Sequence, residues 1–280
     1  MNEVSQLRRS SAIEQLLSDG WLARVDWLSE IDSTNSFLKR ALTEDTASIL
    51  PRLAVADRQT SGRGRGQNAW WSPDGCLMFS IAWRPDRSTQ SDEWDVMPRI
   101  SQLPLVVGIS IASALRAILP NRDQVKVKWP NDVYIDEKKL CGILIESVVG
   151  LAEPCWIIGA GVNVFVNIHN APEPIRSKAT SLHRECLSET MATLCVESVL
   201  LSIVQRLIET MALWQTDGDF LRRQWPDYCM LTDGWVDIKL TDKSLQGTCC
   251  GIDDRGALII QDPRGRRYSV LSGVVESWSL

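Results

Sequence analysis

The chain has 280 residues, of which 44% are hydrophobic and 23% are charged, as in ordinary folded globular proteins. Its formal net charge is −5, and an acidic chain lacks the basic surface that sequence-independent nucleic-acid binding requires. Neither an apolar run of ~18 residues nor an apolar signal-peptide core is visible, so we expect a cytoplasmic protein without a membrane partner.

The chain contains eight cysteines and two histidines, and no two cysteines are spaced as Cys-x-x-Cys. Without that spacing, and with so few histidines, we predict no metal site. Most of the cysteines lie in apolar surroundings and are interpreted as buried thiols. A cysteine–histidine nucleophile pair with His169 or His183 is disfavoured, because neither histidine lies in a motif.

The first third of the chain predicts alternating helices and strands. Residues 13–17 predict a short amphipathic helix that ends at Asp19-Gly20. Over residues 31–36 a strand passes into a helix, because Asp, Ser, Thr and Asn are preferred helix N-caps. Short buried strands are predicted at residues 53–56 and 77–83.

The middle of the chain predicts a helix, a meander of strands and a second helix. The apolar segment 101–119 carries small residues and predicts a helix packed on a sheet. A long helix is expected over residues 190–214, where apolar residues recur at helical spacing. Short turns separate the strands between these helices, which are expected at residues 125–129, 133–135, 140–146 and 156–164.

The pattern changes near residue 230, where short alternating strands replace helical spacing. Residues 235–240 alternate as a half-buried strand does, and residues 253–256 and 262–265 have turn composition. We therefore predict a main domain over residues 1–230 and a small β-barrel over residues 231–280. The predicted fold class is α+β: a mixed, largely antiparallel sheet with helices packed on one side, plus the C-terminal barrel.

The segment 59–70, QTSGRGRGQNAW, is the most informative stretch of the chain. Glycine lets a backbone approach a ligand closely, and arginine supplies a charged fork suited to phosphate and carboxylate. The spacing fits neither a P-loop nor a dinucleotide fingerprint. The segment therefore predicts a loop that folds over an anion, with a solvated basic turn as the alternative.

Lys128 stands at the end of a predicted strand, because Pro130 has no N–H to give to the ladder. A lysine there can neutralise a carboxylate and a phosphate together, and residues 129–132 make a rigid corner with polar side chains beside it. Glycines interrupt two later strands, at Gly142 and at Gly159-Ala160-Gly161. A glycine inside a strand marks close approach of a ligand or tight packing, and the residues leave both interpretations open.

Four segments resemble the biotin protein ligases, also called biotin–[acetyl-CoA-carboxylase] ligases, and occur in the order of that family. They are Asp32-Ser33-Thr34-Asn35, Gln59 to Gly66, Lys128 to Asp132 with Lys139 to Leu144, and Gly159 to Asn163. Each segment alone is weakly specific, whereas the four in order are highly specific. The C-terminal β module also fits the small barrel of this family.

The resemblance implies an ATP-dependent ligase that works in two steps. Biotin would be activated as biotinyl-5′-adenylate and then transferred to a lysine of the biotin carboxyl carrier domain of a biotin-dependent carboxylase. Biotin and ATP would be substrates, Mg²⁺ would assist, and residues 1–230 would form the biotin/ATP-binding catalytic domain. Joining two anions requires fixed positive charge, which agrees with the lysine and arginine residues in the motifs.

The resemblance also implies roles for individual residues. Lys128 and Arg63 would be catalytic, Lys128 by bridging the carboxylate and the α-phosphate. Trp70 and Trp129 would flank the site, with Trp70 near the adenine. The biotin-binding residues would be Ser33, Thr34, Asn35, Gln59, Arg63, Gly64, Arg65, Lys128 and Gly142. The nucleotide-binding residues would be Arg63, Arg65, Trp70, Lys128, Asn131, Lys139 and Asn163.

Two departures from the family are visible in the sequence. The loop ends in Gly66-Gln67-Asn68-Ala69, which is less basic than in many relatives. About 30 residues precede Ser33, too few for the N-terminal helix-turn-helix domain of relatives that act as repressors. We therefore expect no DNA binding.

Two other functions stay open as alternatives. A lipoate–protein ligase shares the broad fold, but the polar run Ser33-Thr34-Asn35 favours a ureido ring over a dithiolane. A non-catalytic regulator that senses biotin would lack its usual N-terminal domain here. Relatives can form a homodimer by joining sheets, and the residues do not decide whether this chain does.

Overall fold

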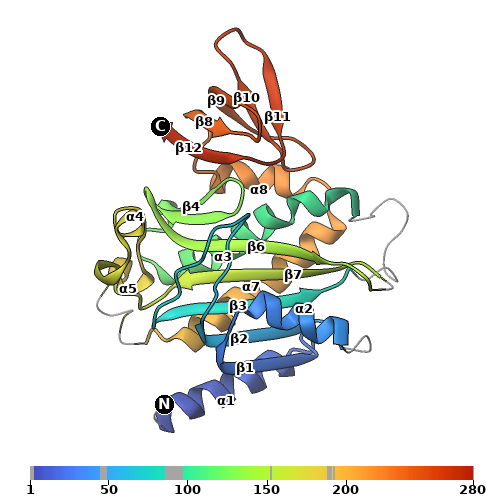
Figure 1. The fold of residues 1–280 in the computed structure, drawn as a ribbon, viewed down its shortest axis with the longest axis vertical. Coiled ribbons are helices and arrows are strands. Elements are labelled where there is room, and N and C mark those ends of the chain that lie inside the picture. Colours follow the sequence, from blue (N-terminus) through green and yellow to red (C-terminus); the bar gives the residue numbers. More distant parts are fainter. Residues whose placement is uncertain are drawn as a thin grey trace.

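The computed structural model describes residues 3–44, 49–85, 97–151, 153–187, 191 and 193–279. Helix α1 lies at one end of an elongated molecule and a C-terminal sheet at the other, with a seven-stranded sheet between them (Figure 1). The helices are α1 Glu3–Ser18, α2 Thr34–Glu44, α3 Leu103–Ile118, α4 Glu173–Arg176, α5 Leu182–Glu185, α7 Val196–Thr216 and α8 Phe220–Tyr228. The strands are β1 Arg24–Ile31, β2 Arg52–Gln59, β3 Cys76–Trp83, β4 Val125–Lys128, β5 Asp132–Ile135, β6 Lys138–Val148, β7 Cys155–Asn163, β8 Trp235–Lys239, β9 Ser244–Ile252, β10 Leu258–Gln261, β11 Arg267–Val270 and β12 Val274–Ser279.

The large sheet has the strand order β1-β2-β3-β7-β6-β5-β4. Strands β1 and β2 run parallel, and every other neighbouring pair in it is antiparallel. This pairing confirms the prediction of a mixed, largely antiparallel sheet, and each predicted strand forms at its expected place. The helix predicted over residues 13–17 is the end of the longer α1, and helix α8, which contains Pro226, was not predicted. The helix predicted from residue 190 is described from Val196, and residues 188–190 and 192 lie outside the described residues.

Strand β3 shows how the two faces of the large sheet differ. Alternate residues of a strand point to opposite faces, and Phe79 and Trp83 belong to the core that α3 and α7 help to form. Ala82 faces the other way and packs with Leu38 and Leu42 of α2. Helices therefore cover both faces, with α2 on the side opposite to α3 and α7 (Figure 1). The prediction that the helices pack on one side is wrong for α2, because the small side chains of that face leave room for it.

Helix α3 is the central helix of the core. The segment Arg99–Ile118 is long and apolar enough to cross a membrane by length and composition, so the expectation that no apolar segment reaches that length is wrong. However, 67% of its most apolar window is buried inside the protein. Gly108 brings α3 close to β4, since a Cβ at this position would lie 3.0 Å from Val127. The apolar character of this helix therefore serves packing against the sheet.

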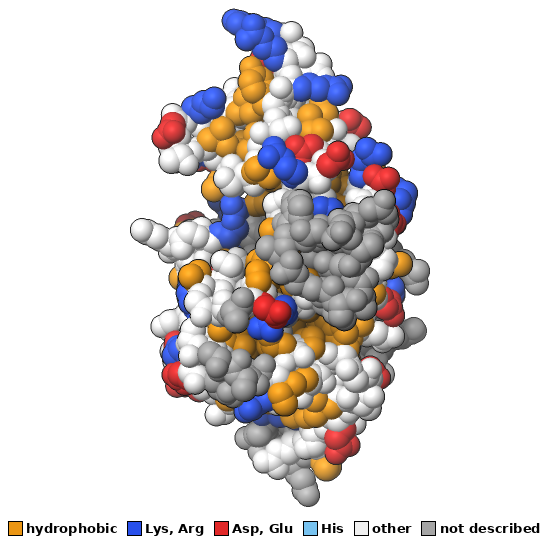
Figure 2. All heavy atoms as spheres, turned by 90° about the vertical axis from the view of Figure 1, so that its right-hand side faces the viewer, with side chains coloured by type: hydrophobic (Ala, Val, Ile, Leu, Met, Phe, Trp, Pro, Cys, Tyr) orange, Lys and Arg blue, Asp and Glu red, His pale blue; other side chains and the backbone are white. Residues whose placement is uncertain are grey.

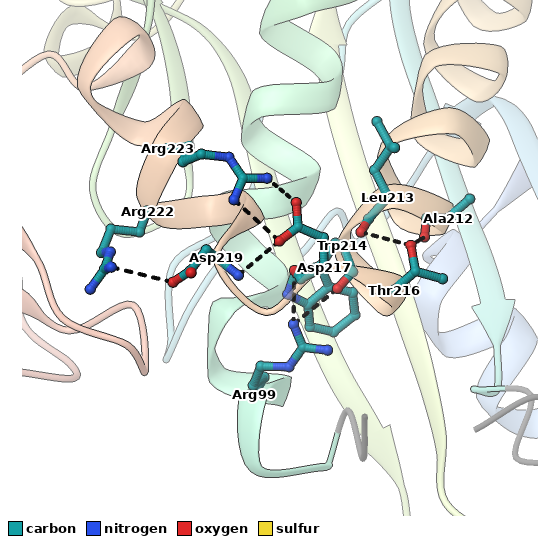
Figure 3. Close-up of polar contacts among 9 residues, drawn as sticks. All are labelled: Arg99, Ala212, Leu213, Trp214, Thr216, Asp217, Asp219, Arg222 and Arg223. Carbon is teal, nitrogen blue, oxygen red and sulfur yellow. Dashed lines mark hydrogen bonds and ion pairs between the residues drawn. The ribbon is translucent and has the colours of Figure 1, made fainter. Parts of the chain in front are cut away.

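A cluster of polar contacts caps the C-terminal end of α7 (Figure 3). Arg99 donates to the carbonyls of Trp214 and Asp217 at 3.0 and 3.3 Å. A cation at this end of a helix offsets the partial negative charge of its last carbonyls. Arg223 of α8 pairs with the Asp217 carboxylate. These contacts join α7 to α8, the helix that precedes the C-terminal sheet.

The C-terminal strands form an antiparallel sheet in the order β11-β10-β9-β8-β12. The predicted turns at residues 253–256 and 262–265 join β9 to β10 and β10 to β11, and the carboxylates of Asp253 and Asp262 accept their backbone N–H groups. This result confirms the antiparallel sheet. Its closure into a barrel stays a prediction, because β11 and β12 are the edges of the described order, and the boundary near residue 230 also stays a prediction.

The described surface carries charges of both signs. On the face shown in Figure 2, acidic, basic and hydrophobic side chains are interspersed, and Lys and Arg side chains lie at the end that carries the C-terminal sheet. The turn between β10 and β11 at that end exposes Arg264, Arg266 and Arg267. The net negative charge of the chain is therefore accompanied by a locally basic tip.

Candidate functional site

A cavity of about 290 Å³ lies on the face of the large sheet that also carries α2. Glycines of β6 and β7 form its floor, and the start of α2, the end of β2 and the glycine-rich segment form its walls. Every predicted site residue lines this cavity except Lys128 and Asn163. The lining residues are Ser33, Thr34, Asn35, Gln59, Arg63, Gly64, Arg65, Asn68, Ala69, Trp70, Asn131, Asp132, Lys139, Gly142, Ile143, Leu144, Gly159, Ala160 and Gly161.

The floor of the cavity depends on the absence of side chains at three glycines. Gly142 of β6 and Gly161 of β7 are direct cross-strand partners. A Cβ at either position would lie within 2.8 Å of the Trp70 indole, which therefore rests directly over both. The side chain of Asn35 takes the corresponding place over Gly159. Gly142 and Gly161 thus admit Trp70, a side chain of the site from outside any helix, whereas Gly159 packs against Asn35 of α2, so the alternative of packing against a helix holds at Gly159.

Buried, short polar side chains at the start of α2 line one end of the cavity. Ser33, Thr34 and Asn35 are at most 4% exposed. Gln59 Oε1 accepts from the Thr34 backbone N at 2.8 Å and lies 3.1 Å from Thr34 Oγ1. Such a set offers hydrogen-bond donors and acceptors to a small polar ring. We call these four residues, Ser33, Thr34, Asn35 and Gln59, the polar end.

Glu146 of β6 connects the glycine-rich segment to the polar end. Arg63 donates to its two carboxylate oxygens at 2.9 and 3.2 Å, the bidentate geometry that fixes an arginine most firmly. Asn35 donates to the same carboxylate at 2.9 Å. Arg63 therefore lies beside the polar end and contacts Glu146 in this structure, and its roles toward biotin and the nucleotide stay predictions.

The glycine-rich segment folds as a small hairpin above the cavity. Gly64 N donates to the Asn68 carbonyl at 2.7 Å, and Trp70 N donates to the Gly62 carbonyl at 2.9 Å. Gly66 at the tip has a φ of 63°, a conformation that favours glycine. A Cβ on Gly62 would lie 2.6 Å from the Trp70 carbonyl oxygen, so the two arms approach closely only because a glycine is there.

Arg65 reaches from this hairpin to the C-terminal sheet. Its Nη1 donates to Asn131 Oδ1 at 3.3 Å and to the Gly273 carbonyl at 3.4 Å. Burial lowers the pKa of Arg65, and the nearby Asp132 carboxylate acts in the opposite direction. Because an arginine side chain stays protonated in proteins, it places a permanent positive charge here. We call Arg65, Asn131, Asp132 and Lys139 the cationic end of the cavity.

Lys139 is the lysine among the described residues that line the cavity. Its Nζ lies 2.7 Å from Asp132 Oδ1 and 5.6 Å from the centre of the Trp70 ring. The side chain passes over Gly142, where a Cβ would lie 3.3 Å from Nζ. An ammonium group in this position can contact an anion that enters the cavity.

Lys128 is directed toward the C-terminal sheet instead. Its Nζ donates to the Val275 carbonyl at 3.3 Å and lies 3.7 Å from the centre of the Trp278 ring. Burial lowers the pKa of Lys128 to about 8, although the Asp132 carboxylate raises it. The bridging role of Lys128 stays a prediction that this position does not support, because Lys139 lines the cavity and Lys128 does not.

Asn163 and Trp129 also lie outside the cavity. Asn163 is 5% exposed, and its Nδ2 donates to the Thr180 carbonyl at 3.0 Å. Trp129 is 2% exposed, and its Nε1 donates to the Gly256 carbonyl of the C-terminal module at 3.2 Å. The prediction that Trp129 flanks the site is therefore wrong, because this side chain joins the two sheets. The nucleotide-binding role of Asn163 stays a prediction that its position does not support.

Three residues near the cavity were not assigned a role from the sequence. Asp132 belongs to the segment Lys128–Asp132 that resembles the family, but its ion pair with Lys139 could not be predicted from the spacing of these residues. Glu146 had a signal, namely a single acidic residue within an apolar strand. Ser80 of β3 had none, because a serine inside a buried strand is also an ordinary small core residue.

Comparison with known proteins covers both sheets. The biotin/lipoate A/B protein ligase family matches residues 27–163, and the biotin protein ligase C-terminal domain matches residues 236–278. The bifunctional ligase/repressor BirA of Salmonella typhimurium is 30% identical over an alignment of 280 positions that covers 99% of this chain and 78% of that protein. The chain belongs to the biotin protein ligase family.

Other members of the family match along almost their whole length. The biotin–[acetyl-CoA-carboxylase] ligase of Mycobacterium tuberculosis is 27% identical, with 96% of this chain and 95% of that protein aligned. The structure of the biotin protein ligase from Aquifex aeolicus in complex with biotin and ATP superposes with a TM-score of 0.70 at 31% identity, covering 92% of this chain and 98% of that one. Both the large sheet and the C-terminal sheet of this chain therefore match members of the family.

Proposed function

We propose that this protein is an ATP-dependent biotin–protein ligase that forms biotinyl-5′-adenylate and transfers biotin to a lysine of a carboxylase's biotin carboxyl carrier domain. The observation that carries the proposal is a single cavity with a buried polar end and a cationic end, in a chain of this family. The polar end suits an uncharged ureido ring, and the cationic end suits the carboxylate and phosphate that must be joined.

In the first step a carboxylate oxygen of biotin attacks the α-phosphorus of ATP, and pyrophosphate leaves. Both reactants are negative, so the barrier falls when fixed cations share the charge of the transition state. Lys139 and Arg65 supply that charge at the cationic end. The indole of Trp70, held flat by the glycine floor, offers a face on which the adenine can stack.

In the second step the amine of the carrier lysine attacks the acyl carbon of the adenylate, and AMP leaves. Water would hydrolyse this mixed anhydride, so the site must exclude solvent between the steps. The hairpin that carries Arg63 and Arg65 covers the cavity and suits this purpose. The carrier domain as partner and a cytoplasmic location belong to the same proposal.

In this proposal Mg²⁺ binds together with the phosphates of the nucleotide. Asp132 is the carboxylate among the described lining residues, and no group of three or more acidic, histidine or cysteine residues that could hold a metal occurs in the described part of the chain. Proteins often bind Mg²⁺ through one or two carboxylates together with substrate phosphates. This donor set therefore fits an ion that arrives with ATP and neutralises phosphate charge.

A lipoate–protein ligase is the second candidate, because the matching family model includes lipoate ligases. A dithiolane ring could satisfy neither the amide of Gln59 nor the hydroxyl of Thr34, and unpaired buried polar groups weaken binding. The polar end therefore favours biotin over lipoate.

The test is transfer of labelled biotin to a purified carrier domain in the presence of ATP and Mg²⁺. We expect label on the carrier lysine with the whole protein. Transfer of lipoate instead of biotin would assign the sister activity. Binding of biotin without adenylate or transfer would support the regulator.

A further inference from the structure

Ser80 lies behind the polar end and does not line the cavity. It is 0% exposed on β3, with its Oγ 2.6 Å from Asn35 Oδ1 and 2.7 Å from Thr34 Oγ1. It therefore links two residues that do line the cavity. Because a hydroxyl group carries one proton, the direction of each hydrogen bond in this network follows from counting protons.

Asn35 fixes the first direction. Its Nδ2 lies 2.9 Å from a Glu146 carboxylate oxygen and 3.4 Å from the Leu144 carbonyl, and both of these oxygens can only accept. The amide can therefore have only one orientation, in which Oδ1 faces Ser80. Ser80 must donate to this oxygen, which uses its only proton.

The direction of the hydrogen bond between Thr34 and Ser80 follows from the hydrogen bond that Ser80 donates to Asn35. Since Ser80 has no second proton, the 2.7 Å contact requires the Thr34 hydroxyl to donate to Ser80. Gln59 Oε1 lies farther from the Thr34 hydroxyl, at 3.1 Å, and does not need its proton, because it already accepts from the Thr34 backbone N–H at 2.8 Å. Toward a ligand, Thr34 Oγ1 therefore presents lone pairs. Gln59 Nε2, which donates to no described residue, remains as a donor.

We propose that Ser80 is a positioning residue that sets the polar end as an acceptor at Thr34 beside a donor at Gln59. This pattern complements a cyclic urea, in which a ring N–H donates and the adjacent carbonyl accepts. The inference rests on the proposed function for the identity of the ligand. It deepens that function by assigning part of the ring specificity to a side chain that the ligand does not touch.

The test compares the wild type with Ser80→Ala and with Ser110→Ala as a matched control. Ser110 is also 0% exposed, but it donates to the Val106 carbonyl within α3, on the opposite face of the sheet. Each protein is measured for its KM for biotin, its KM for ATP and its inhibition by biotin analogues in which one ring N–H is replaced by oxygen. The ratio of analogue to biotin affinity reports the hydrogen-bond pattern and not the stability of the fold.

In Ser80→Ala the Thr34 hydroxyl is free to turn its proton toward the ligand. We expect the KM for biotin to rise about tenfold, the effect of one misdirected hydrogen bond, with the KM for ATP unchanged. The wild type should reject the oxygen analogue, because its lone pairs would face those of Thr34. That discrimination should fall about tenfold in Ser80→Ala and stay at the wild-type value in Ser110→Ala.

A Ser80→Ala protein with the wild-type affinity ratio overturns the inference, even when it is less stable, because a merely structural serine would leave the ratio unchanged. If the alanine variant does not fold, Ser80→Cys, a weaker donor of similar size, is judged by the same ratio. Failure of the wild type itself to bind or activate biotin would instead remove the proposed function, and the inference with it.

Discussion

At the polar end of the cavity, Thr34, Asn35 and Ser80 bond to one another and are almost fully buried between the large sheet and α2. At the cationic end, in contrast, Arg65 and the neighbouring Lys128 bond to backbone carbonyls of the C-terminal sheet. The polar end is thus complete within one part of the molecule, whereas the cationic end needs both sheets. Recognition of the ring and activation of the carboxylate should therefore be separable by substitution.

The largest effect is expected for Lys139→Met, which removes the cavity's lysine and leaves Asp132 without its ion pair. Adenylate formation should fall on the order of 10²–10³-fold, because a fixed charge at the reacting groups is lost. Pyrophosphate release measures this rate, and biotin affinity should stay near the wild-type value. Lys138→Met, one residue earlier on β6, is the control. A near-normal rate in Lys139→Met would return the bridging role to Lys128.

A smaller effect is expected for Trp278→Leu, which removes the ring under the Lys128 ammonium. A cation–π contact of a buried lysine is worth roughly 1–2 kcal/mol, so the KM for ATP should rise about fivefold to thirtyfold while the KM for biotin stays constant. Trp235→Leu is the control, since Trp235 is 41% exposed on the same sheet. An equal rise in both KM values would contradict the division between the two ends.

Hydrogen exchange tests whether the hairpin of the glycine-rich segment contacts the ligands at either end of the cavity. We expect residues 60–69 to exchange more slowly when biotin and ATP are bound, since a ligand would add contacts to Arg63 and Arg65. Glu146→Gln should speed exchange of this segment without ligand, because it weakens the bidentate pair with Arg63. Peptides from β10 and β11 serve as the internal reference. If the exchange rate of residues 60–69 is the same with and without biotin and ATP, the hairpin does not close over these ligands.

The smallest effect is the pH dependence of stability that Lys128 contributes. The pKa of Lys128 is lowered from 10.5 to about 8 in the folded protein, so between these values the unfolded chain binds more protons than the folded one. The free energy of unfolding of the wild type relative to Lys128→Met should therefore rise as pH increases from about 8 to about 10.5 and be flat below about pH 8. Urea midpoints at about pH 7 and about pH 10 measure it. If the difference in the free energy of unfolding between the wild type and Lys128→Met does not change with pH, the pKa of Lys128 is not lowered by folding.

Much of the site could be predicted from the sequence because its motifs are local. Ser33, Thr34 and Asn35 stand where a strand passes into a helix, and cap chemistry places such side chains together. The glycine-rich segment likewise contains its own hairpin, from Gly62 to Trp70. The contacts by which Ser80 and Glu146 join these motifs could not be predicted, because their partners are distant in the chain, although the single acidic residue in an apolar strand marked Glu146 itself.

Periodicity and short spacing in the sequence were enough to predict the strands and the long helices, the motifs of the family and the polar residues that line one end of the cavity, but not helix α8. Tertiary structure alone decided which lysine reaches the cavity. Strand β4 is the edge of the large sheet, and the C-terminal sheet contributes Val275 and Trp278 to cover Lys128 there. Lys139, two strands nearer the middle, passes over Gly142 into the cavity. Strand order and docking bring these groups together, and neither is encoded in the spacing of any one motif.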